Sequence, residues 1–438
     1  MSNKGLLKNI ASLGAVQIAN YVFPLISIPI ISRIIGPDKF GVINYAIAFI
    51  SYFTLLISYG FDLTATRRVV KDPQNVILRS RIFSEVFYAK ILLFSLSVIL
   101  FSICLFIVPP LMAEKSVAIY TFLFCIGTVF TQNWLFQGMN ELPKVAILNL
   151  ISKFLFTFAI LLIVQKKADY VWQPLLSAII QISIALASFY WAKIRYHLTF
   201  VKVSLKDIID LLLNERTVFF SLVAVSLYTT TNTVVLGLMT NETQVGYYTA
   251  GQRLIDVAST VINIPLSQAL YPFIGMAFAE SKEIGILTVQ KIIPLIVFFT
   301  VIMAFGMLIF GPIVLKWFYG NSFSPSVPVF QIIAFVPFVI ALSNVFGIQI
   351  MLNLNMDKIF FKITAGGAII GIILNIIMVH YLGSIGTALN WLVVELYITM
   401  TMYLVLKARN VNPIDLKQFN PKLIINQLKG ILIIFGKK

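Results

Sequence analysis

RIIGPDKFGVINYAIAFISYFTLLISYGFDLTATRR, residues 33–68, is the stretch that decides the fold of this chain. It opens with a tight turn from Gly36 to Gly41, where glycine and proline end one helix and permit the next. The segment from about Val42 to Phe61 contains no Asp, Glu, Lys or Arg. It has about the 20 residues that a helix needs to cross a bilayer. A basic exit follows, so the stretch predicts a membrane hairpin with cations on one side.

The composition supports the same class for the whole chain. Of 438 residues, 59% are hydrophobic and 11% are charged, whereas a soluble domain carries about a quarter charged residues. The formal net charge of +16 does not indicate nucleic-acid binding, because the basic residues lie in the connections between apolar runs. This placement is typical of the positive-inside bias of membrane proteins, and we expect no nucleic-acid partner.

Runs of about 20 mainly apolar residues predict twelve membrane spans. Their approximate ranges are 10–32, 42–61, 89–108, 117–136, 145–164, 171–192, 217–239, 246–278, 287–318, 327–352, 359–382 and 385–406. With both termini placed in the cytoplasm, 26 of the 33 basic residues lie on the cytoplasmic side. This asymmetry predicts cytoplasmic termini. The seven basic residues elsewhere are Arg33, Lys39, Lys115, Lys166, Lys167, Arg253 and Lys316.

The predicted fold is an all-α polytopic membrane protein with two six-helix lobes around a central cavity. The lobes are residues 1–194 and 217–407, joined by a cytoplasmic linker at 195–216, because the longest cytoplasmic connection falls there. A short echo between halves, Phe40-Gly41 and Val245-Gly246, agrees with a repeat, which is common in transporters. The cytoplasmic tail, 408–438, ends in an apolar segment after Pro421, read either as an interfacial helix or as a disordered tail.

Enzyme motifs are nearly absent from the sequence. No Walker A sequence is present, and neither His197 nor His380 has a carboxylate or a cysteine at ligand spacing. Cys104 and Cys125 lie in apolar runs without the spacing of a metal or redox motif. We therefore expect no catalytic residue, metal or cofactor, and the functional candidates are polar groups within the membrane.

Arg253 and Asp256 are the sharpest pair of candidates. Counted from Gly246, they lie about 10 Å and about 15 Å into the eighth span. Their i, i+3 spacing places them on one helix face, which is costly to expose to lipid. The pair is read as part of a substrate pathway, with a structural ion pair as the alternative.

Two further ionisable residues lie deep within predicted spans. Glu395 is about ten residues into the last span, and it is read equally as a partner of Lys362 or as a protonatable site for ion coupling. Asp256 is the other ion-coupling candidate. Lys153 lies about 12 Å into the fifth span, where it lines a cavity or snorkels to the surface. Lys90 is closer to the surface, and snorkelling is expected there.

The inner end of the second span carries Asp62, Arg67 and Arg68. Two interpretations of this group remain open. The three side chains hold a gate or bind lipid phosphate, or they anchor the span at the inner leaflet.

Five segments together resemble the O-antigen flippases of the multidrug/oligosaccharidyl-lipid/polysaccharide exporter superfamily. The matching segments are RIIGPDKFG (33–41), YGFDLTATR (59–67), WLFQG (134–138), VGYYTA (245–250) and LYP (270–272). They occur in the expected order over most of the first 280 residues. Arg33 and Arg67 belong to these motifs, and Arg253 matches the polar region of the family's eighth helix.

The resemblance implies a flippase of the bacterial inner membrane that moves undecaprenyl-pyrophosphate-linked oligosaccharides from the cytoplasmic to the periplasmic leaflet. It implies alternating access, coupling to H⁺ or Na⁺, and a cationic cavity that suits a pyrophosphate. Membrane lipids and other polysaccharide-assembly membrane proteins are the expected partners. A cation-coupled drug exporter of the same superfamily is the first alternative. A membrane enzyme of polysaccharide assembly ranks below it, because no large outer loop is present.

Overall fold

The computed structural model describes residues 3–265 and 270–423, and within these ranges the regular elements are all helices. The chain forms two compact units. Unit 1 comprises Met1–Tyr247 and Phe318–Phe323, and unit 2 comprises Tyr248–Trp317 and Ser324–Lys438. The two six-helix lobes drawn from the sequence stay a prediction, and so does their linker at 195–216. The predicted interfacial helix of the tail falls mainly on residues 424–438, outside the described ranges.

Among its described residues, unit 1 holds eleven α-helices, a 3₁₀ turn and residues of three later elements. The α-helices are α1 (Asn3–Ser58), α2 (Phe61–Lys71), α3 (Val76–Ile107), α4 (Pro109–Ala113), α5 (Lys115–Phe122), α6 (Phe124–Phe130), α7 (Asn133–Gly138), α8 (Leu142–Ile163), α9 (Trp172–Arg195), α10 (Leu205–Thr229) and α11 (Thr231–Met239). The 3₁₀ turn is η1 (Lys167–Val171). The first residues of α12 (Glu242–Pro265), the last two residues of α14 (Lys282–Tyr319) and the turn η3 (Asn321–Phe323) complete this unit.

Unit 2 holds the rest of α12 and the later helices. These are α13 (Tyr271–Glu280), α14 (Lys282–Tyr319) as far as Trp317, α15 (Ser326–Ile333), α16 (Val336–Asn344), the π-helix η4 (Val345–Met351), α17 (Asp357–Ala408) and η5 (Leu416–Phe419).

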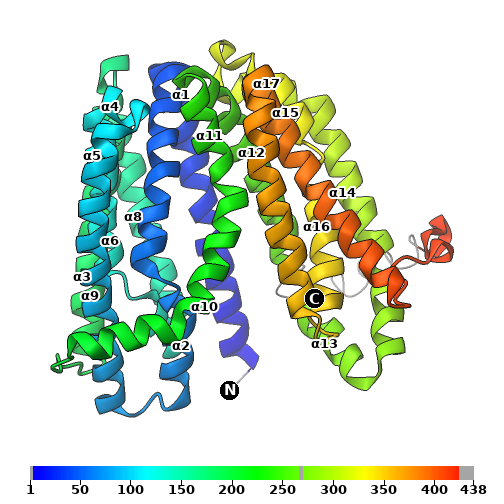
Figure 1. The fold of residues 1–438 in the computed structure, drawn as a ribbon, viewed down its shortest axis with the longest axis horizontal. Helices are drawn as coiled ribbons and strands as arrows, with labels where there is room; N and C mark the ends of the chain where they lie inside the picture. The colour runs from blue at the N-terminus through cyan, green and yellow to red at the C-terminus, as the bar shows by residue number, and fades with distance from the viewer. Residues whose placement is uncertain (1–2, 266–269, 424–438) are drawn as a thin grey trace. The chain divides into compact units, whose positions relative to one another are not determined.

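Two long helices contain a reversal at a single glycine. Gly36 in α1 has a φ of 76°, and Gly383 in α17 has a φ of 55°, a left-handed region that side chains disfavour. Figure 1 shows α1 rising from the N-terminus and turning back beside itself. The predicted turn at Gly36-Pro37 is thus confirmed. It is shorter than the expected segment from Gly36 to Gly41, because the helix resumes at Pro37.

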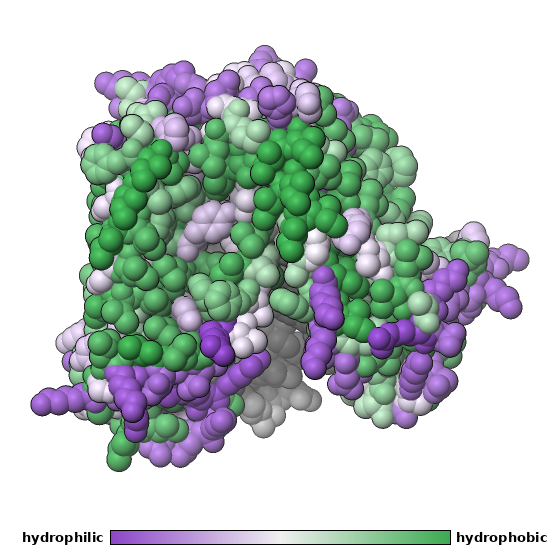
Figure 2. Space-filling model, viewed as in Figure 1, coloured by the Kyte–Doolittle hydropathy of each residue, from purple (hydrophilic) through white to green (hydrophobic). Residues whose placement is uncertain are grey.

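Eight helical stretches among the described residues are long and apolar enough to cross a membrane. They confirm an all-α, multi-pass membrane protein, while the number of twelve spans stays a prediction. Hydrophobic residues cover much of the face seen in Figure 2. Exposed apolar side chains are usual where lipid, and not water, is the solvent.

The segment after α9 is fastened to α3 by its backbone. The amide of Thr199 donates to the Ser80 hydroxyl at 3.2 Å, and the amide of Val201 donates to the Ser84 hydroxyl at 2.9 Å. Two extended residues span about 6.6 Å, and one turn of four helical residues rises about 6 Å, so donors and acceptors match in spacing. Between them, Phe200 packs its ring against Phe83, 5.4 Å away between centroids.

The core of unit 2 lies between α14, α16, η4 and α17. Within α17, the helix before Gly383 packs on the helix after it at two small residues. A Cβ on Gly367 would lie 2.6 Å from Ile398, and one on Gly371 would lie 3.1 Å from Val394. These close contacts hold the C-terminal half of α17, which carries Glu395, against its own first half.

Candidate functional site

The helices α1 and α12 cross in unit 1 with their backbones in contact. A Cβ added to Gly41 would lie 1.7 Å from the carbonyl oxygen of Glu242. A Cβ added to Gly246 would lie 2.0 Å from the carbonyl oxygen of Pro37. Both positions therefore require glycine, because any side chain would force the helices apart. The echo of Phe40-Gly41 in Val245-Gly246 marks this crossing.

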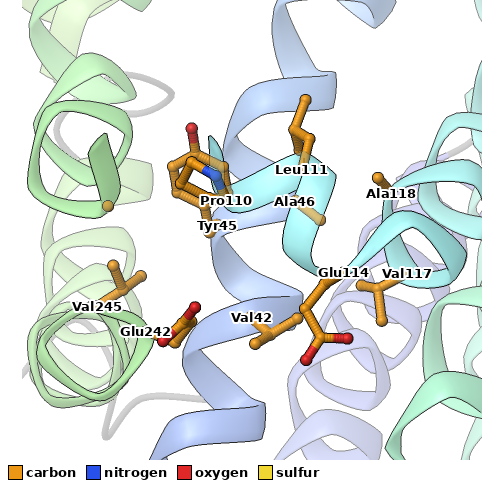
Figure 3. Close-up of a pocket in the computed structure, with 11 residues that line it drawn as sticks. Val42, Tyr45, Ala46, Pro110, Leu111, Glu114, Val117, Ala118, Glu242 and Val245 are labelled. Carbon is orange, nitrogen blue, oxygen red and sulfur yellow. The ribbon is translucent and has the colours of Figure 1, made fainter. Parts of the chain in front are cut away.

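A cavity of about 10 Å³, room for about one water molecule, lies beside the crossing. Figure 3 shows Val42 between two carboxylates that line it, Glu114 and Glu242. Glu114 accepts hydrogen bonds from the Lys39 ammonium at 2.6 Å and from the Tyr170 hydroxyl at 2.6 Å. This ion pair ties the turn after Gly36 to α5 and η1.

Arg33 lies at the end of the first helix of α1, and its side chain is exposed. Its stem packs beside Gly320, where a Cβ would lie 3.3 Å from the Arg33 Cγ. Nearby, Asp38 of the turn pairs with Lys167 at 2.9 Å. Arg33 therefore lies next to the turn at Gly36, whose Asp38 is paired with Lys167 of η1.

Asp62 and Arg67 are both exposed on the short helix α2. Arg68, one residue on, instead donates to the buried carboxylate of Glu85 on α3. Glu85 also pairs with Arg81 at 2.9 Å. Of the three predicted residues of this end, Arg68 is thus held in an ion pair, whereas Asp62 and Arg67 are exposed.

Arg68 also lines a cleft of about 390 Å³ between α2, α3 and α10. Its lining residues are Arg68, Arg81, Glu85, Asp207, Asp210, Leu211, Asn214 and Glu215. Glu215 accepts a hydrogen bond from Thr64, and burial raises the pKa of its carboxyl above the ordinary value. With four carboxylates and two guanidinium groups, the cleft favours cations over phosphates. Sequence patterns missed this cleft, because its residues come from three separate helices.

Arg253 and Asp256 lie on α12 in unit 2. Gly251, Ile255 and Ser259 form the face of α12 that turns inward, with Gly251 in contact with α15. Arg253 and Asp256 project from the other side, where Arg253 is half-buried and Asp256 is exposed. The predicted common face of the two charges follows from their helical spacing.

Glu395 is 6% exposed and turns toward the interior of unit 2. One turn later, the Thr399 hydroxyl donates to the carbonyl of Val339 on α16 at 3.3 Å, so this face of α17 packs on α16. Lys362, the possible partner named from the sequence, has an exposed side chain. The two sequence interpretations, a partner of Lys362 and a protonatable site, stay predictions.

The two lysines of predicted spans in unit 1 differ in environment. Lys153 on α8 is exposed at the surface of the unit. Lys90 on α3 is 3% exposed, and its ammonium donates to the backbone carbonyls of Thr131 at 2.8 Å and Thr128 at 3.2 Å. The expected snorkelling of Lys90 is wrong, because these carbonyls hold its charge inside the unit.

Glu141 forms a second polar cluster that the sequence did not indicate. It accepts hydrogen bonds from Arg195 at 2.6 Å, from Tyr196 at 2.6 Å and from Lys144. The hydrogen bond from Arg195 lowers the pKa of Glu141 to about 2, and Lys144 and Tyr196 act in the same direction. The cluster joins the start of α8 to the end of α9.

Metal ligands do not gather in the part of the chain that the structure describes. Within those residues, no group of three or more His, Cys, Asp or Glu side chains is arranged to hold a metal ion.

Comparison with known proteins gives a consistent picture. A family model described as polysaccharide biosynthesis protein matches residues 6–278. An Escherichia coli (strain K12) protein named "Putative O-antigen transporter" is 28% identical over 405 residues, which cover 91% of this chain and 95% of the relative. A protein of the same name from Shigella dysenteriae is 26% identical, covering 90% and 98%.

Two solved structures share the fold. The lipid II flippase MurJ superposes with a TM-score of 0.67 at 15% identity, covering 97% of this chain and 92% of that one. A multidrug resistance MATE family transporter of the MOP superfamily superposes with a TM-score of 0.63 at 14% identity, covering 88% and 95%. At this level of identity the likeness concerns the fold alone.

Proposed function

We propose, since this chain belongs to the polysaccharide biosynthesis protein family, that it flips lipid-linked oligosaccharides across the bacterial inner membrane. The chain is a membrane transporter and not an enzyme. The proposed substrate is an undecaprenyl-pyrophosphate-linked O-antigen unit or a similar oligosaccharide. It would pass from the cytoplasmic to the periplasmic leaflet by alternating access, with both termini in the cytoplasm.

Arg253 is the observation that carries this proposal. It is a half-buried guanidinium within a predicted span, on the face of α12 that turns away from α15. A charged group that faces hydrocarbon is costly, so an ionisable residue within a span usually lines a polar pathway or belongs to a polar cluster. A pyrophosphate accepts paired hydrogen bonds from a guanidinium, and this match of geometry supports a phosphate-bearing substrate.

Glu395 is the proposed ion-coupling group, and Asp256 is the second candidate. A buried carboxyl group that exchanges a proton or binds Na⁺ between two states of unit 2 would link an ion gradient to substrate movement. The burial of Glu395 among apolar residues of α16 and α17 supports this role. Lys153, Arg33, Asp62 and Arg67 are exposed, and for them we propose contact with lipid headgroups or with the arriving substrate.

Reconstituted vesicles provide the test. A fluorescent undecaprenyl-pyrophosphate oligosaccharide is placed in one leaflet, and its movement is followed with a membrane-impermeant quencher. The expected result is movement by the wild-type protein and a loss of roughly tenfold or more in Arg253→Ala, the value of one charge-assisted hydrogen bond. Arg409→Ala, which removes an exposed arginine after α17, is the matched control and should move substrate normally.

Two outcomes would overturn the proposal. Wild-type rates in Arg253→Ala would remove the guanidinium from the pathway. No lipid movement, together with gradient-driven efflux of an organic cation from the same vesicles, would assign the chain to drug export.

A further inference from the structure

The helical stretch from Lys115 to Gly138 is interrupted inside unit 1. Helix α6 ends at Phe130 and α7 begins at Asn133, so that Thr131 and Gln132 leave the helix. The amide of Leu135, which would donate to Thr131 in a continuous helix, donates instead to Gln132 at 3.0 Å. The carbonyl of Thr131 has thus lost its helical partner. Backbone groups of this kind are costly in a membrane unless another donor satisfies them.

The ammonium of Lys90 supplies that donor. It lies 2.8 Å from the Thr131 oxygen and 3.2 Å from the Thr128 oxygen, both at the C-terminal end of α6. The C-terminal end of a helix carries partial negative charge, so it attracts a cation. Broken helices in transporters use such carbonyls to coordinate ions. Here a side chain of the protein occupies the corresponding position.

The surroundings of this ammonium are otherwise apolar. Ala89 and Leu93, its neighbours on α3, are buried with Trp134 and Leu135 in one core cluster. Among the described residues, no carboxylate forms an ion pair with Lys90, and Asp62 acts on it only electrostatically. The carbonyls are therefore its direct partners.

Gln132 adds an independent observation at the same break. Its side chain is 1% exposed, and both its amide oxygen and its amide nitrogen are buried without a hydrogen-bond partner. It follows Thr131 directly in the chain. The break thus contains a buried acceptor, the Gln132 amide oxygen, in addition to the carbonyls that Lys90 uses. A buried polar atom without a partner is uncommon in a purely structural contact.

We propose that the break at Thr131-Gln132 is a binding site for a small monovalent cation, which the protein fills with its own Lys90 ammonium. Removal of that ammonium opens the site to a free primary alkylammonium ion. The n-propylammonium ion replaces the atoms that Lys90→Ala removes, three carbons and the ammonium nitrogen. Its three N–H groups can donate to the same carbonyl oxygens.

Thermal unfolding of the purified full chain in detergent tests this site. Lys90→Ala is expected to lower the Tm by about 5 °C or more. Addition of n-propylammonium chloride should raise the Tm of Lys90→Ala with saturation and leave the wild-type Tm unchanged, because a ligand stabilises only a protein that binds it. Tetramethylammonium chloride at the same concentration, which has no N–H group, is the salt control.

Lys90→Met is the second variant, since it keeps the length of the side chain without the charge. It should lose stability like Lys90→Ala and should not respond to n-propylammonium. A wild-type Tm in Lys90→Met would overturn the proposal, as would equal shifts of Lys90→Ala by the two salts. Failure of both Lys90 variants to accumulate, while Lys153→Met accumulates, would support the need for a cation at this break.

Discussion

Gly41 and Gly246 make the same contact with each other's helix. Gly41 lies against the carbonyl of Glu242, four residues before Gly246, and Gly246 lies against the carbonyl of Pro37, four residues before Gly41. Reciprocal contacts of this kind arise when two similar segments are related by a local two-fold axis. The short sequence echo at these glycines is therefore matched by an equivalence in space.

Gly41→Ala is expected to destabilise the protein. The new Cβ would lie 1.7 Å from the Glu242 oxygen, so the two backbones must separate. Overpacking of this kind costs about 1–3 kcal/mol, and the Tm in detergent should fall by several degrees. Gly246→Ala should behave alike, because its Cβ meets the Pro37 oxygen in the same way.

Gly306→Ala is the matched control for both variants. It lies within α14, and a Cβ there would meet nothing within 4 Å. Its Tm should be unchanged or higher, because alanine is the better helix former. A Gly41→Ala protein as stable as Gly306→Ala would contradict the close backbone contact of α1 and α12 at Gly41.

Glu141→Gln should lower the Tm at neutral pH by roughly 2–4 °C. The pKa of Glu141 is held near 2, below its ordinary value of 4.5, so its charge stabilises the folded state above about pH 4.5. That contribution is lost as the pH falls toward 2. The difference in Tm between the two proteins should therefore shrink over this interval, which unfolding scans at a series of pH values would measure.

Glu280→Gln is the control for Glu141, since it removes an exposed carboxylate at the end of α13. It should leave the Tm and its pH dependence unchanged. A constant difference between Glu141→Gln and wild type from pH 7 to pH 2 would show that the charge of Glu141 is unimportant.

Glu395→Gln is expected to uncouple substrate movement from the ion gradient. The amide keeps the size of the side chain but neither releases a proton nor carries a charge for Na⁺. In the vesicle assay, an imposed gradient should accelerate the wild type roughly tenfold and leave the variant unaffected. Glu283→Gln, an exposed carboxylate on α14, should retain the response. A full response in Glu395→Gln would remove this residue from the coupling mechanism.

The double variant Ser80→Ala and Ser84→Ala should release the segment after α9. It removes both acceptors of the Thr199 and Val201 amides, at a net cost of about 0.5–1.5 kcal/mol each. Tryptic cleavage at the exposed Lys202 should then accelerate roughly tenfold.

Ser95→Ala provides the comparison for the serine pair. This exposed serine also lies on α3, and its hydroxyl donates within its own helix to the Ile91 carbonyl. Its cleavage rate should equal that of the wild type. Equal rates in all three proteins would mean that the serines do not hold this segment.

The sequence predicted those features that depend on local chemistry. Gly36-Pro37 indicated a reversal because only a few residues tolerate its backbone geometry, and α1 reverses there. Long apolar runs indicated helices, because a segment that crosses a membrane must satisfy its own backbone hydrogen bonds. The equivalence of Gly41 and Gly246 was visible as a motif, although their mutual contact was not.

The placement of single charges could not be predicted from depth along a span. Lys90 was expected at the surface, but it satisfies a break at Thr131-Gln132 that contains neither glycine nor proline. Glu141 gathers Lys144 from its own helix start and Arg195 from the end of α9, far along the chain. Such contacts depend on tertiary packing, which periodicity does not encode.

The fastening of residues 199–201 to α3 has a consequence for the divergence of relatives. The hydrogen bonds come from the backbone of Thr199 and Val201, so many residue types would serve at both positions. Phe200 meets the rings of Phe83 and Phe189. We therefore expect evolutionary drift to be uneven over three consecutive residues, rapid at the outer two and slow at the aromatic one between them.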